Sequence, residues 1–484
     1  MANTAKLTIT KLVKELLVLN IYGKMREKKF FITLILLIVI TIGCIYLLSF
    51  IKEKINLSYA HIFMLSLTVL LLSFFILLLF RYLIILILSL LAHFRYKNEL
   101  LKEEDLKTVS IIMPVYNEEK ILATVINSLL NLNYPKEKYE VIIVDDGSKD
   151  NSYSIAYQFL KNEKGIKLKL LRQENQGKAK ALNRGIWESN GEIIVCIDSD
   201  CVITKNSLIY GVRHFQDEKV GAVAGNVKIW NQDKLFVKLQ ALEYMEGLNF
   251  TRQALGFLNK VNIVPGAIGF FRREVLEKVG LYNGNIYAED CDLTLRILKA
   301  GYKVVYEPKA VVYTEAPESI NCLFKQRYRW TRGILQAVRK NNHLLYHSKA
   351  SFSLILSYLL LIYEAFFWPA MNLIAHLFFA LLALLYGFIP FLFIWWFSLT
   401  LLDFSSACYA YVSDKKSENN AYNNKKIIFS HLPFLVLIYR LFYLLLIDTI
   451  KVFAFLEEVL NLEMGWQRIK ITGKLNGYIV REKV

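Results

Sequence analysis

Long apolar runs stand on both sides of a stretch, from about Val109 to Gly301, in which apolar and polar residues alternate over short distances. The runs cover residues 30–50, 60–94, 351–412 and 427–459. A helix needs about 20 predominantly apolar residues to cross a bilayer, and each run is long enough. The mixed stretch cannot lie in lipid, because its polar groups would lose their hydrogen bonds to water. The sequence therefore predicts a multi-pass membrane protein with a separate water-soluble domain in its middle.

The positive charges around the first run predict which side of the membrane this domain faces. Four Lys and Arg residues lie at 24–29, just before the run, whereas the next loop, 51–59, holds two lysines. Cytoplasmic loops carry the excess of Lys and Arg, so we expect the amino terminus and the middle domain in the cytoplasm, at the inner (plasma) membrane. The expected order is a cytoplasmic amphipathic segment (1–29), two membrane helices (30–94), the soluble domain (105–345), two membrane helices (351–412), a further transmembrane or interfacial helix (427–459) and a cytoplasmic tail (460–484).

The composition argues against two classes of protein. A net charge of +17 would suit nucleic acid, but no nucleic-acid-binding motif accompanies it, so we expect anionic lipid or a nucleotide as the partner instead. The six cysteines form no C-x-x-C pair, and two of them lie inside apolar runs. This pattern favours reduced thiols over a zinc site or a disulfide framework.

Strands and helices are expected to alternate in the middle stretch. The expected strands are Val109–Pro114, Tyr139–Val144, Leu168–Leu171 and Ile193–Ile197, and the expected helices are Glu119–Asn131, Asn151–Lys161 and Lys178–Trp187. Such βαβ alternation predicts a parallel, doubly wound sheet of the α/β class.

Two carboxylates, Asp198 and Asp200, directly follow the fourth expected strand. Ligands of open α/β sheets bind beyond the carboxyl ends of the strands, and Mg²⁺ or Mn²⁺ takes carboxylate and phosphate oxygens. We therefore expect a metal and diphosphate site here, although a solvated turn is the alternative. No basic residue is apparent nearby that could neutralise a diphosphate alone, so we also expect strict dependence on a divalent cation.

Polar residues follow the other expected strands as well. Tyr116 to Glu119 follows the first and Asp145 to Ser148 the second, while Gln176 to Lys180 opens a helix. A tyrosine ring and carboxylates can stack on a base and accept its N–H groups, and a helix amino terminus with lysines favours a diphosphate. Each piece alone is an ordinary turn, but their succession predicts a nucleotide-diphosphate site.

The chain resembles the processive family 2 glycosyltransferases, the membrane-embedded synthases of cellulose, chitin, hyaluronan and poly-β-N-acetylglucosamine. The resemblance covers Ser110 to Gly333 strongly and the flanking helices more loosely. It is carried, in order, by IIMPVYNEE, VIIVDDGSKDNS, NQGKAKALN, CIDSD, PGAIGFFRR, AEDCDLTLR and QRYRW.

The resemblance implies a GT-A nucleotide-sugar fold embedded between membrane helices, with Mg²⁺ or Mn²⁺ as cofactor. The nucleotide sugar would be bound by Tyr116, Glu118, Asp145, Asp146, Lys178, Asp198 and Arg329, and the metal by Asp198 and Asp200. Asp290 would be the general base, paired with Glu289, and Gln326 and Trp330 would bind the acceptor sugar. Ala288 replaces the threonine usual in the family. Trp330 has an alternative role as an interfacial membrane anchor.

The expected reaction is the polymerisation of a UDP-activated sugar into an exported polysaccharide. One carboxylate base and one displacement invert the anomeric centre, so an α-linked donor gives a β-linked product. GAVAGN and AEDCDLT resemble the poly-β-N-acetylglucosamine branch, which implies UDP-N-acetylglucosamine as donor. The expected partners are the UDP-sugar, the growing polysaccharide and the lipid bilayer, and a small accessory or export subunit is left open.

Three alternatives remain at this point. The first is a synthase of the hyaluronan or cellulose type. The second is a non-processive transferase that makes a lipid-phosphate sugar, although such enzymes lack the Gln-x-x-Arg-Trp motif. The third is a non-catalytic assembly subunit, which would need a broken acid set, whereas Asp145, Asp198, Asp200 and Asp290 are all present.

Overall fold

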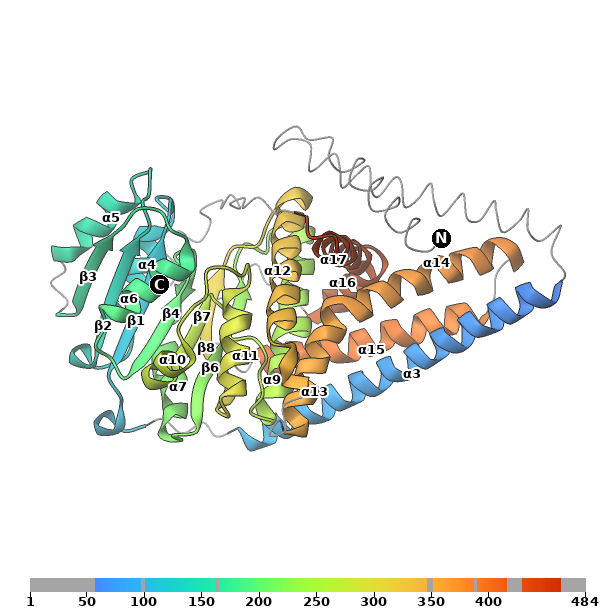
Figure 1. Ribbon diagram of the computed structural model, residues 1–484, viewed down its shortest axis with the longest axis horizontal. Coiled ribbons are helices and arrows are strands. Elements are labelled where there is room, and N and C mark those ends of the chain that lie inside the picture. Colours follow the sequence, from blue (N-terminus) through green and yellow to red (C-terminus); the bar gives the residue numbers. More distant parts are fainter. Residues whose placement is uncertain are drawn as a thin grey trace.

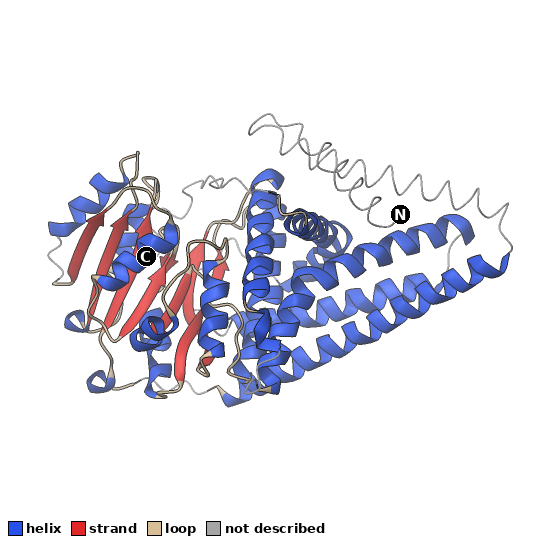
Figure 2. Cartoon of the chain, in the orientation of Figure 1, coloured by secondary structure: helices blue, strands red, loops and turns tan. Residues whose placement is uncertain are grey.

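A computed structural model describes residues 57–96, 101–161, 165–345, 351–386, 390–415 and 429–462. The expected segment 1–29, the first apolar run at 30–50 and the tail from 463 lie outside the described residues. An α/β domain and a set of long helices lie side by side (Figure 1). The sheet belongs wholly to the first part, and helices make up the second (Figure 2).

One eight-stranded sheet forms the centre of the α/β domain. Its strands are β1 (Val109–Val115), β2 (Tyr139–Asp145), β3 (Lys167–Arg172), β4 (Ile193–Ile197), β5 (Val202–Ile203), β6 (Val220–Ile229), β7 (Ile268–Arg272) and β8 (Lys303–Thr314), in the spatial order β3-β2-β1-β4-β7-β6-β8-β5. The first four strands are parallel, as predicted. The expectation of a parallel sheet is wrong beyond β4, because β7 runs antiparallel to both of its neighbours.

The reversal at β7 has a consequence for the carboxyl end of β4. Ile197, the last residue of β4, pairs with Ile268, the first residue of β7. The loop that enters β7 therefore lies beside the residues that leave β4. This places the Pro265–Gly266 turn next to Asp198.

Successive residues of the central strands are buried on opposite faces of the sheet. Ile111 and Met113 pack with α4 (Leu122–Leu129), α5 (Ser152–Gln158) and α7 (Ser207–Val212). Ile112 packs on the other face with α6 (Lys178–Trp187), α10 (Arg273–Val279) and α11 (Glu289–Lys299). Each fully buried aliphatic side chain contributes about 1.5–3 kcal/mol, so the apolar strands require helices on both faces.

A layer of helices separates the sheet from the long apolar helices (Figure 1). It consists of α8 (Leu235–Glu243), the π-helical segment η5 (Tyr244–Phe250), α9 (Thr251–Phe257) and α12 (Ile320–Lys340). Helix α9 contacts both β8 and the apolar helix α3, and α12 contacts α11 and α17. This layer therefore connects the apolar helices to the sheet domain.

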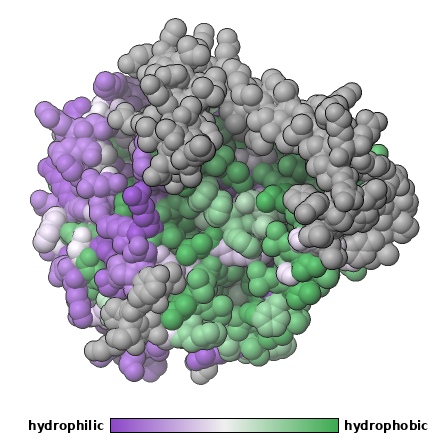
Figure 3. Space-filling model, turned by 45° about the vertical axis from the view of Figure 1, so that its right-hand side comes forward, coloured by the Kyte–Doolittle hydropathy of each residue, from purple (hydrophilic) through white to green (hydrophobic). Residues whose placement is uncertain are grey.

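Eight helical segments make up most of the apolar part of the described chain. They are α3 (Leu57–Arg95), α13 (Phe352–Ile362), η7 (Tyr363–Phe367), α14 (Trp368–Tyr386), α15 (Pro390–Lys415), α16 (Leu432–Ile438), η9 (Tyr439–Tyr443) and α17 (Leu444–Val459). Ser66–Arg95, Phe352–Leu384 and Leu432–Val459 are long and apolar enough to cross a membrane, which indicates a membrane protein. On the face shown in Figure 3, hydrophobic residues gather over this part and hydrophilic residues over the sheet domain.

The last apolar helix differs in direction from the others. Figure 1 views α17 nearly end-on, whereas α3, α14 and α15 lie in the plane of the picture. If those three helices cross a bilayer, α17 lies steeply across them.

Two ion pairs join charged residues of the apolar helices. Arg81 on α3 forms an ion pair with Glu364 on η7, and Arg440 on η9 pairs with Asp403 on α15. Ionisable groups at membrane depth are costly unless they are paired and face the protein. Arg81 thus faces the protein interior, and these pairs set which helices lie next to one another.

Candidate active site

The candidate site begins with a lysine that bridges carboxylates from two elements. Lys178 is the first residue of α6, and its Nζ lies 2.5 Å from Oδ1 of Asp198 and 3.5 Å from Oε1 of Glu289. Burial alone would lower the pKa of Lys178, but these carboxylates raise it overall, so the amine stays charged. The expectation that Asp198 has no basic neighbour is wrong, because the sheet brings residues 20 apart in sequence into contact.

The residues after β4 fit a divalent cation. The carboxylate oxygens of Asp198 and Asp200 and the sulfur of Cys201 lie within 4.8 Å of one another. Burial and the neighbouring Asp198 raise the pKa of Asp200 to about 6, because both disfavour a second negative charge at this place. A cation bound between the two carboxylates would offset that repulsion. Cys201 was not predicted, and its position next to Asp200 is the only signal in the sequence. Its thiol donates a hydrogen bond of 3.2 Å to Asp200.

The acid pair opens α11. Asp290 accepts hydrogen bonds from the backbone N–H of Cys291 at 2.8 Å and of Gly266 at 3.3 Å. Burial and the neighbouring Glu289 raise the pKa of Asp290 to about 6, although these N–H groups favour its charged form. A carboxylate with this pKa is ionised at neutral pH and still basic enough to take a proton from a hydroxyl.

Gly266 is the point at which the carboxylates and the lysine meet. A Cβ atom on Gly266 would lie 2.8 Å from Nζ of Lys178 and 3.6 Å from Oδ2 of Asp198. The loop before β7 thus packs its backbone directly against the charged groups and contributes an N–H to Asp290. Gly266 is not among the predicted site residues. Its signal in the sequence is its place in PGAIGFFRR.

The loops after β1 and β2 are joined by hydrogen bonds. Asn117 has a left-handed backbone with φ of 56°. Its N–H donates to Oγ of Ser148 at 3.0 Å, and its Oδ1 accepts from the N–H of Lys149 at 2.7 Å. The N–H of Glu118 donates to Oγ of Ser152 at 2.7 Å. These bonds hold the predicted nucleotide residues Tyr116 and Glu118 beside the loop that follows Asp145.

The two aspartates at the carboxyl end of β2, Asp145 and Asp146, have different surroundings. Asp146 accepts hydrogen bonds from the backbone N–H groups of Gln176 and Gly177, at 3.0 and 2.9 Å, and from the amide of Gln173 at 2.7 Å. It holds the turn into α6, which carries Lys178. Asp145 is 1% exposed, and its Oδ2 makes no hydrogen bond with any described residue, although Arg172 lies 3.3 Å away. Asp145 therefore retains an acceptor for a ligand.

A close helix contact brings α12 to the acid pair. A Cβ atom on Gly333 would lie 2.4 Å from the backbone nitrogen of Ala288 and 2.6 Å from its Cβ. Gln326, Trp330 and Gly333 recur at helical spacing, so they lie along one side of α12. The contact explains why a small residue suits position 288. It also brings the side of α12 with the predicted acceptor residues toward Glu289 and Asp290.

Arg329 and Trp330 differ in the contacts they make. The half-buried Arg329 makes no hydrogen bond or ion pair within the described part of the chain, so its charge is available to an anion. The Trp330 ring lies 6.3 Å from the ring of Tyr244 and 4.3 Å from the guanidinium of Arg327. Contacts with Tyr244 and Arg327 thus fix the position of the Trp330 ring.

Comparison with known proteins identifies the sheet domain. Residues 110–280 match the model of glycosyl transferase family 2. The chain carries a family 2 glycosyltransferase domain. It is 32% identical over 235 residues to the poly-β-1,6-N-acetyl-D-glucosamine synthase of Staphylococcus epidermidis, which covers 48% of this chain and 56% of that protein. The enzyme of the same name from Staphylococcus aureus strain COL is 32% identical over 231 residues, covering 48% and 55%. The match thus spans about half the length of these relatives.

A solved structure confirms the GT-A fold of the family 2 domain. The chain aligns with the mannosyltransferase PcManGT from Pyrobaculum calidifontis, determined in complex with GDP-Man and Mn²⁺, with a TM-score of 0.53 and 22% identity. The alignment covers 74% of this chain and 99% of that one. At this level of identity the likeness shows the fold alone.

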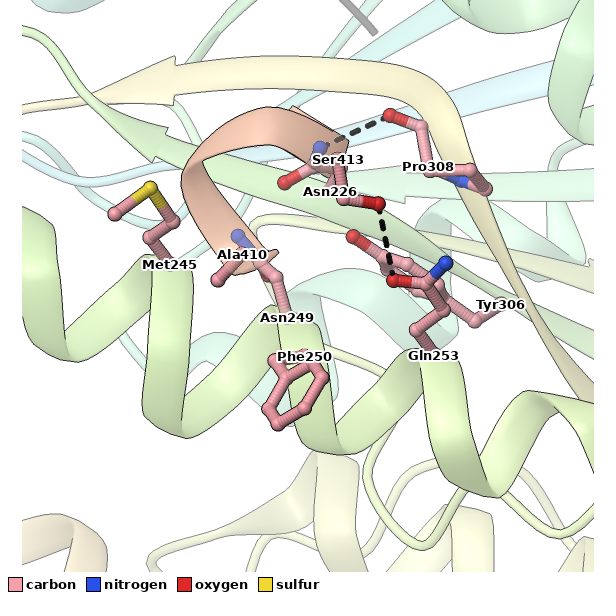
Figure 4. A pocket seen from close by; sticks show the side chains of 9 residues that line it. All are labelled: Asn226, Met245, Asn249, Phe250, Gln253, Tyr306, Pro308, Ala410 and Ser413. Carbon is pink, nitrogen blue, oxygen red and sulfur yellow. Dashed lines mark hydrogen bonds between the residues drawn. The ribbon is translucent and has the colours of Figure 1, made fainter. Parts of the chain in front are cut away.

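A small pocket lies where the family 2 domain meets the apolar helices (Figure 4). It is lined by Asn226, Met245, Asn249, Phe250, Gln253, Tyr306, Pro308, Ala410 and Ser413. Asn226 donates to the carbonyl of Pro308 at 2.9 Å, and Ser413 donates to Gln253 at 3.4 Å, so two hydrogen bonds join residues of the pocket lining. None of its residues belongs to the candidate active site.

Proposed function

We propose that this protein is an inverting, processive β-glycosyltransferase that polymerises UDP-N-acetylglucosamine and passes the polysaccharide outward across the membrane. The observation that carries the proposal is the cluster formed by Lys178, Asp198 and the Glu289–Asp290 pair, against which Gly333 presses the helix that bears Gln326 and Trp330. One acid cluster thereby faces both a donor and an acceptor site. The similarity to synthases of poly-β-1,6-N-acetyl-D-glucosamine supports the choice of sugar.

The donor occupies the carboxyl ends of the parallel strands. Tyr116 stacks on the uracil ring, and Asp145 accepts a hydrogen bond from the single N–H group of that ring. Lys178, at the amino terminus of α6, and Arg329, which lacks a partner in the described chain, bind the diphosphate. Asp198 and Asp200 hold Mg²⁺ or Mn²⁺, which when bound neutralises charge on the departing diphosphate. Mn²⁺ in the mannosyltransferase of the same fold supports use of a divalent cation.

The acceptor sugar lies between the donor and α12. Trp330 stacks on its ring, and Gln326 binds its hydroxyls. Asp290 takes the proton of the attacking hydroxyl, whose oxygen bonds to the anomeric carbon as the bond to the diphosphate breaks. A single displacement inverts that carbon. Glu289 keeps the amine of Lys178 at the site while the diphosphate leaves.

The topology expected from the sequence supports a cytoplasmic location for this chemistry. The basic residues at 24–29 favour a cytoplasmic amino terminus, and an even number of crossings before residue 105 puts the family 2 domain on the same side. The apolar helices then carry the product outward. An accessory or export subunit would contact these helices.

Purified protein in lipid nanodiscs, given labelled UDP-sugars one at a time with Mg²⁺ or Mn²⁺, tests the proposal. We expect a long polymer of N-acetylglucosamine from UDP-N-acetylglucosamine alone, and none from Asp290→Asn. Polymer from UDP-glucose alone would indicate a cellulose-type synthase, and a requirement for UDP-glucuronic acid a hyaluronan type. A butanol-extractable product with a single sugar would indicate a lipid-phosphate transferase and overturn the proposal.

A further inference from the structure

Arg327 lies inside the Gln-Arg-Tyr-Arg-Trp segment, yet it is 3% exposed and points away from solvent. Its Nε and Nη2 donate to the two carboxylate oxygens of Glu243 on α8, at 3.0 and 2.6 Å. Its Nη1 donates to Oε1 of Gln326. The guanidinium carbon lies 4.3 Å from the ring centroid of Trp330. One side chain therefore touches both residues assigned to the acceptor.

Glu243, the partner of Arg327, is also bound by a residue of the apolar helices. The hydroxyl of Tyr443 on η9 donates to Oε2 of Glu243 at 2.5 Å, the same oxygen that accepts from Nη2 of Arg327. The bidentate pair leaves the planar guanidinium no freedom to rotate. Tyr244, the next residue after Glu243, packs against the ring of Trp330. The Trp330 ring thus contacts both Arg327 and the residue that follows the partner of Arg327.

Stability alone is a poor explanation for this arrangement. Burying an ion pair costs desolvation that its attraction often only repays, so a buried pair is weak support for a stabilising role. The geometry has a second consequence, because the orientation of the guanidinium sets both the amide of Gln326 and the ring of Trp330.

We propose that Arg327 is a positioning residue for the acceptor, oriented by Glu243 and through it by the apolar helix segment η9. The proposal rests on the proposed function, in which Gln326 and Trp330 bind the acceptor sugar. It adds that acceptor recognition, and not donor binding, depends on the Arg327–Glu243 pair. Arg327 touches no reacting atom and acts through its two neighbours.

Helix α12 offers a matched control. Arg332 is equally buried on the same helix, and it pairs with Glu458 at 2.7 Å and with Tyr328 at 3.0 Å. The structure shows no contact of Arg332 with Gln326 or Trp330. Arg327→Lys and Arg332→Lys each keep the charge but lose the planar, bidentate guanidinium. Both should lower stability, whereas only the first should affect the acceptor.

The experiment measures binding and turnover separately in full-length protein in detergent or nanodiscs. A fluorescent β-1,6-linked N-acetylglucosamine oligosaccharide is titrated in the presence of UDP, and KM is measured for UDP-N-acetylglucosamine. We expect Arg327→Lys and Glu243→Gln to weaken oligosaccharide binding at least tenfold and to change the donor KM less than twofold. Tyr443→Phe should produce a smaller effect of the same kind, and Arg332→Lys should leave both quantities within twofold of the wild type.

Three outcomes would overturn the assignment, and a fourth concerns the proposed function. Unchanged oligosaccharide affinity in Arg327→Lys, or equal losses in Arg327→Lys and Arg332→Lys, would make Arg327 a structural residue only. If the wild type binds the oligosaccharide but transfers no sugar, the proposed function fails, while the binding series still decides the role of Arg327. If the wild type does not bind the oligosaccharide, the positioning role fails for this acceptor.

Discussion

At the scale of single residues, the candidate site consists of charges that restrain one another. Lys178 is shared by Asp198 and Glu289, and Asp290 lies beside Glu289 with two backbone N–H groups as partners. Removing one charge leaves a neighbouring charge without its partner, so each single substitution should change a particular step of the reaction. Three predictions follow from these contacts.

Asp290→Asn should abolish sugar transfer to the acceptor and leave UDP affinity nearly unchanged. The carboxylate acts on the acceptor hydroxyl only in the transition state, and loss of a general base costs about 10²–10⁴-fold in rate. Turnover assays and calorimetric titration with UDP measure the two effects. Equal losses in rate and in UDP affinity would instead show that Asp290 binds the nucleotide.

The rate should fall as the pH is lowered through about 6. Burial and Glu289 raise the pKa of Asp290 to about 6, so below that pH the base is protonated and can no longer accept a proton. We expect kcat, measured with saturating donor and metal, to drop about tenfold per pH unit below this value and to be flat above it. An acid limb near pH 4 would mean that the carboxylate that limits the rate has an ordinary pKa.

Chelation of divalent cations should stop turnover even though Lys178 neutralises part of the charge on Asp198. One ammonium already shared by two carboxylates leaves too little charge for a diphosphate. Asp198→Asn and Asp200→Asn should each cost about two to three orders of magnitude in rate, the scale of preorganised charge stabilisation. Full activity in excess chelator would disprove the metal site.

At the scale of elements, the close approach of α12 to the start of α11 requires a glycine at position 333. A Cβ on Gly333 would meet the backbone of Ala288 at 2.4 Å, and backbone cannot move aside as a flexible side chain can. Gly333→Ala should therefore push α12 from the acid pair and lower the transfer rate at least tenfold, measured at saturating donor. Gly247→Ala is the matched control, because a Cβ there meets nothing within 4 Å. Equal rates in the two variants would show that the contact does not set the site.

At the scale of the whole molecule, the product length should depend on where the acceptor is held. Trp330 lies on the helix layer between the sheet domain and the apolar helices, so a chain held there stays in place between additions (Figure 1). Trp330→Ala should shorten the polymer and increase UDP release without transfer, since one aromatic face contributes about 0.5–1.5 kcal/mol beyond its burial. Gel filtration of the product measures this. Product of unchanged length and rate would leave Trp330 as a membrane anchor.

Local sequence patterns were enough to predict much of the architecture. The first four strands could be predicted because their apolar runs are buried on both faces and end in turn residues, and Asp198 and Asp200 had to follow the fourth. The family motifs pointed to the GT-A fold, which the comparisons bear out. Tertiary structure alone decided the antiparallel β7, the ion pair of Lys178 with Asp198 and the bond between Arg327 and Glu243, 84 residues apart. These contacts join segments that are distant in sequence, so they depend on how the layers of the fold pack together. Local sequence patterns do not encode that packing.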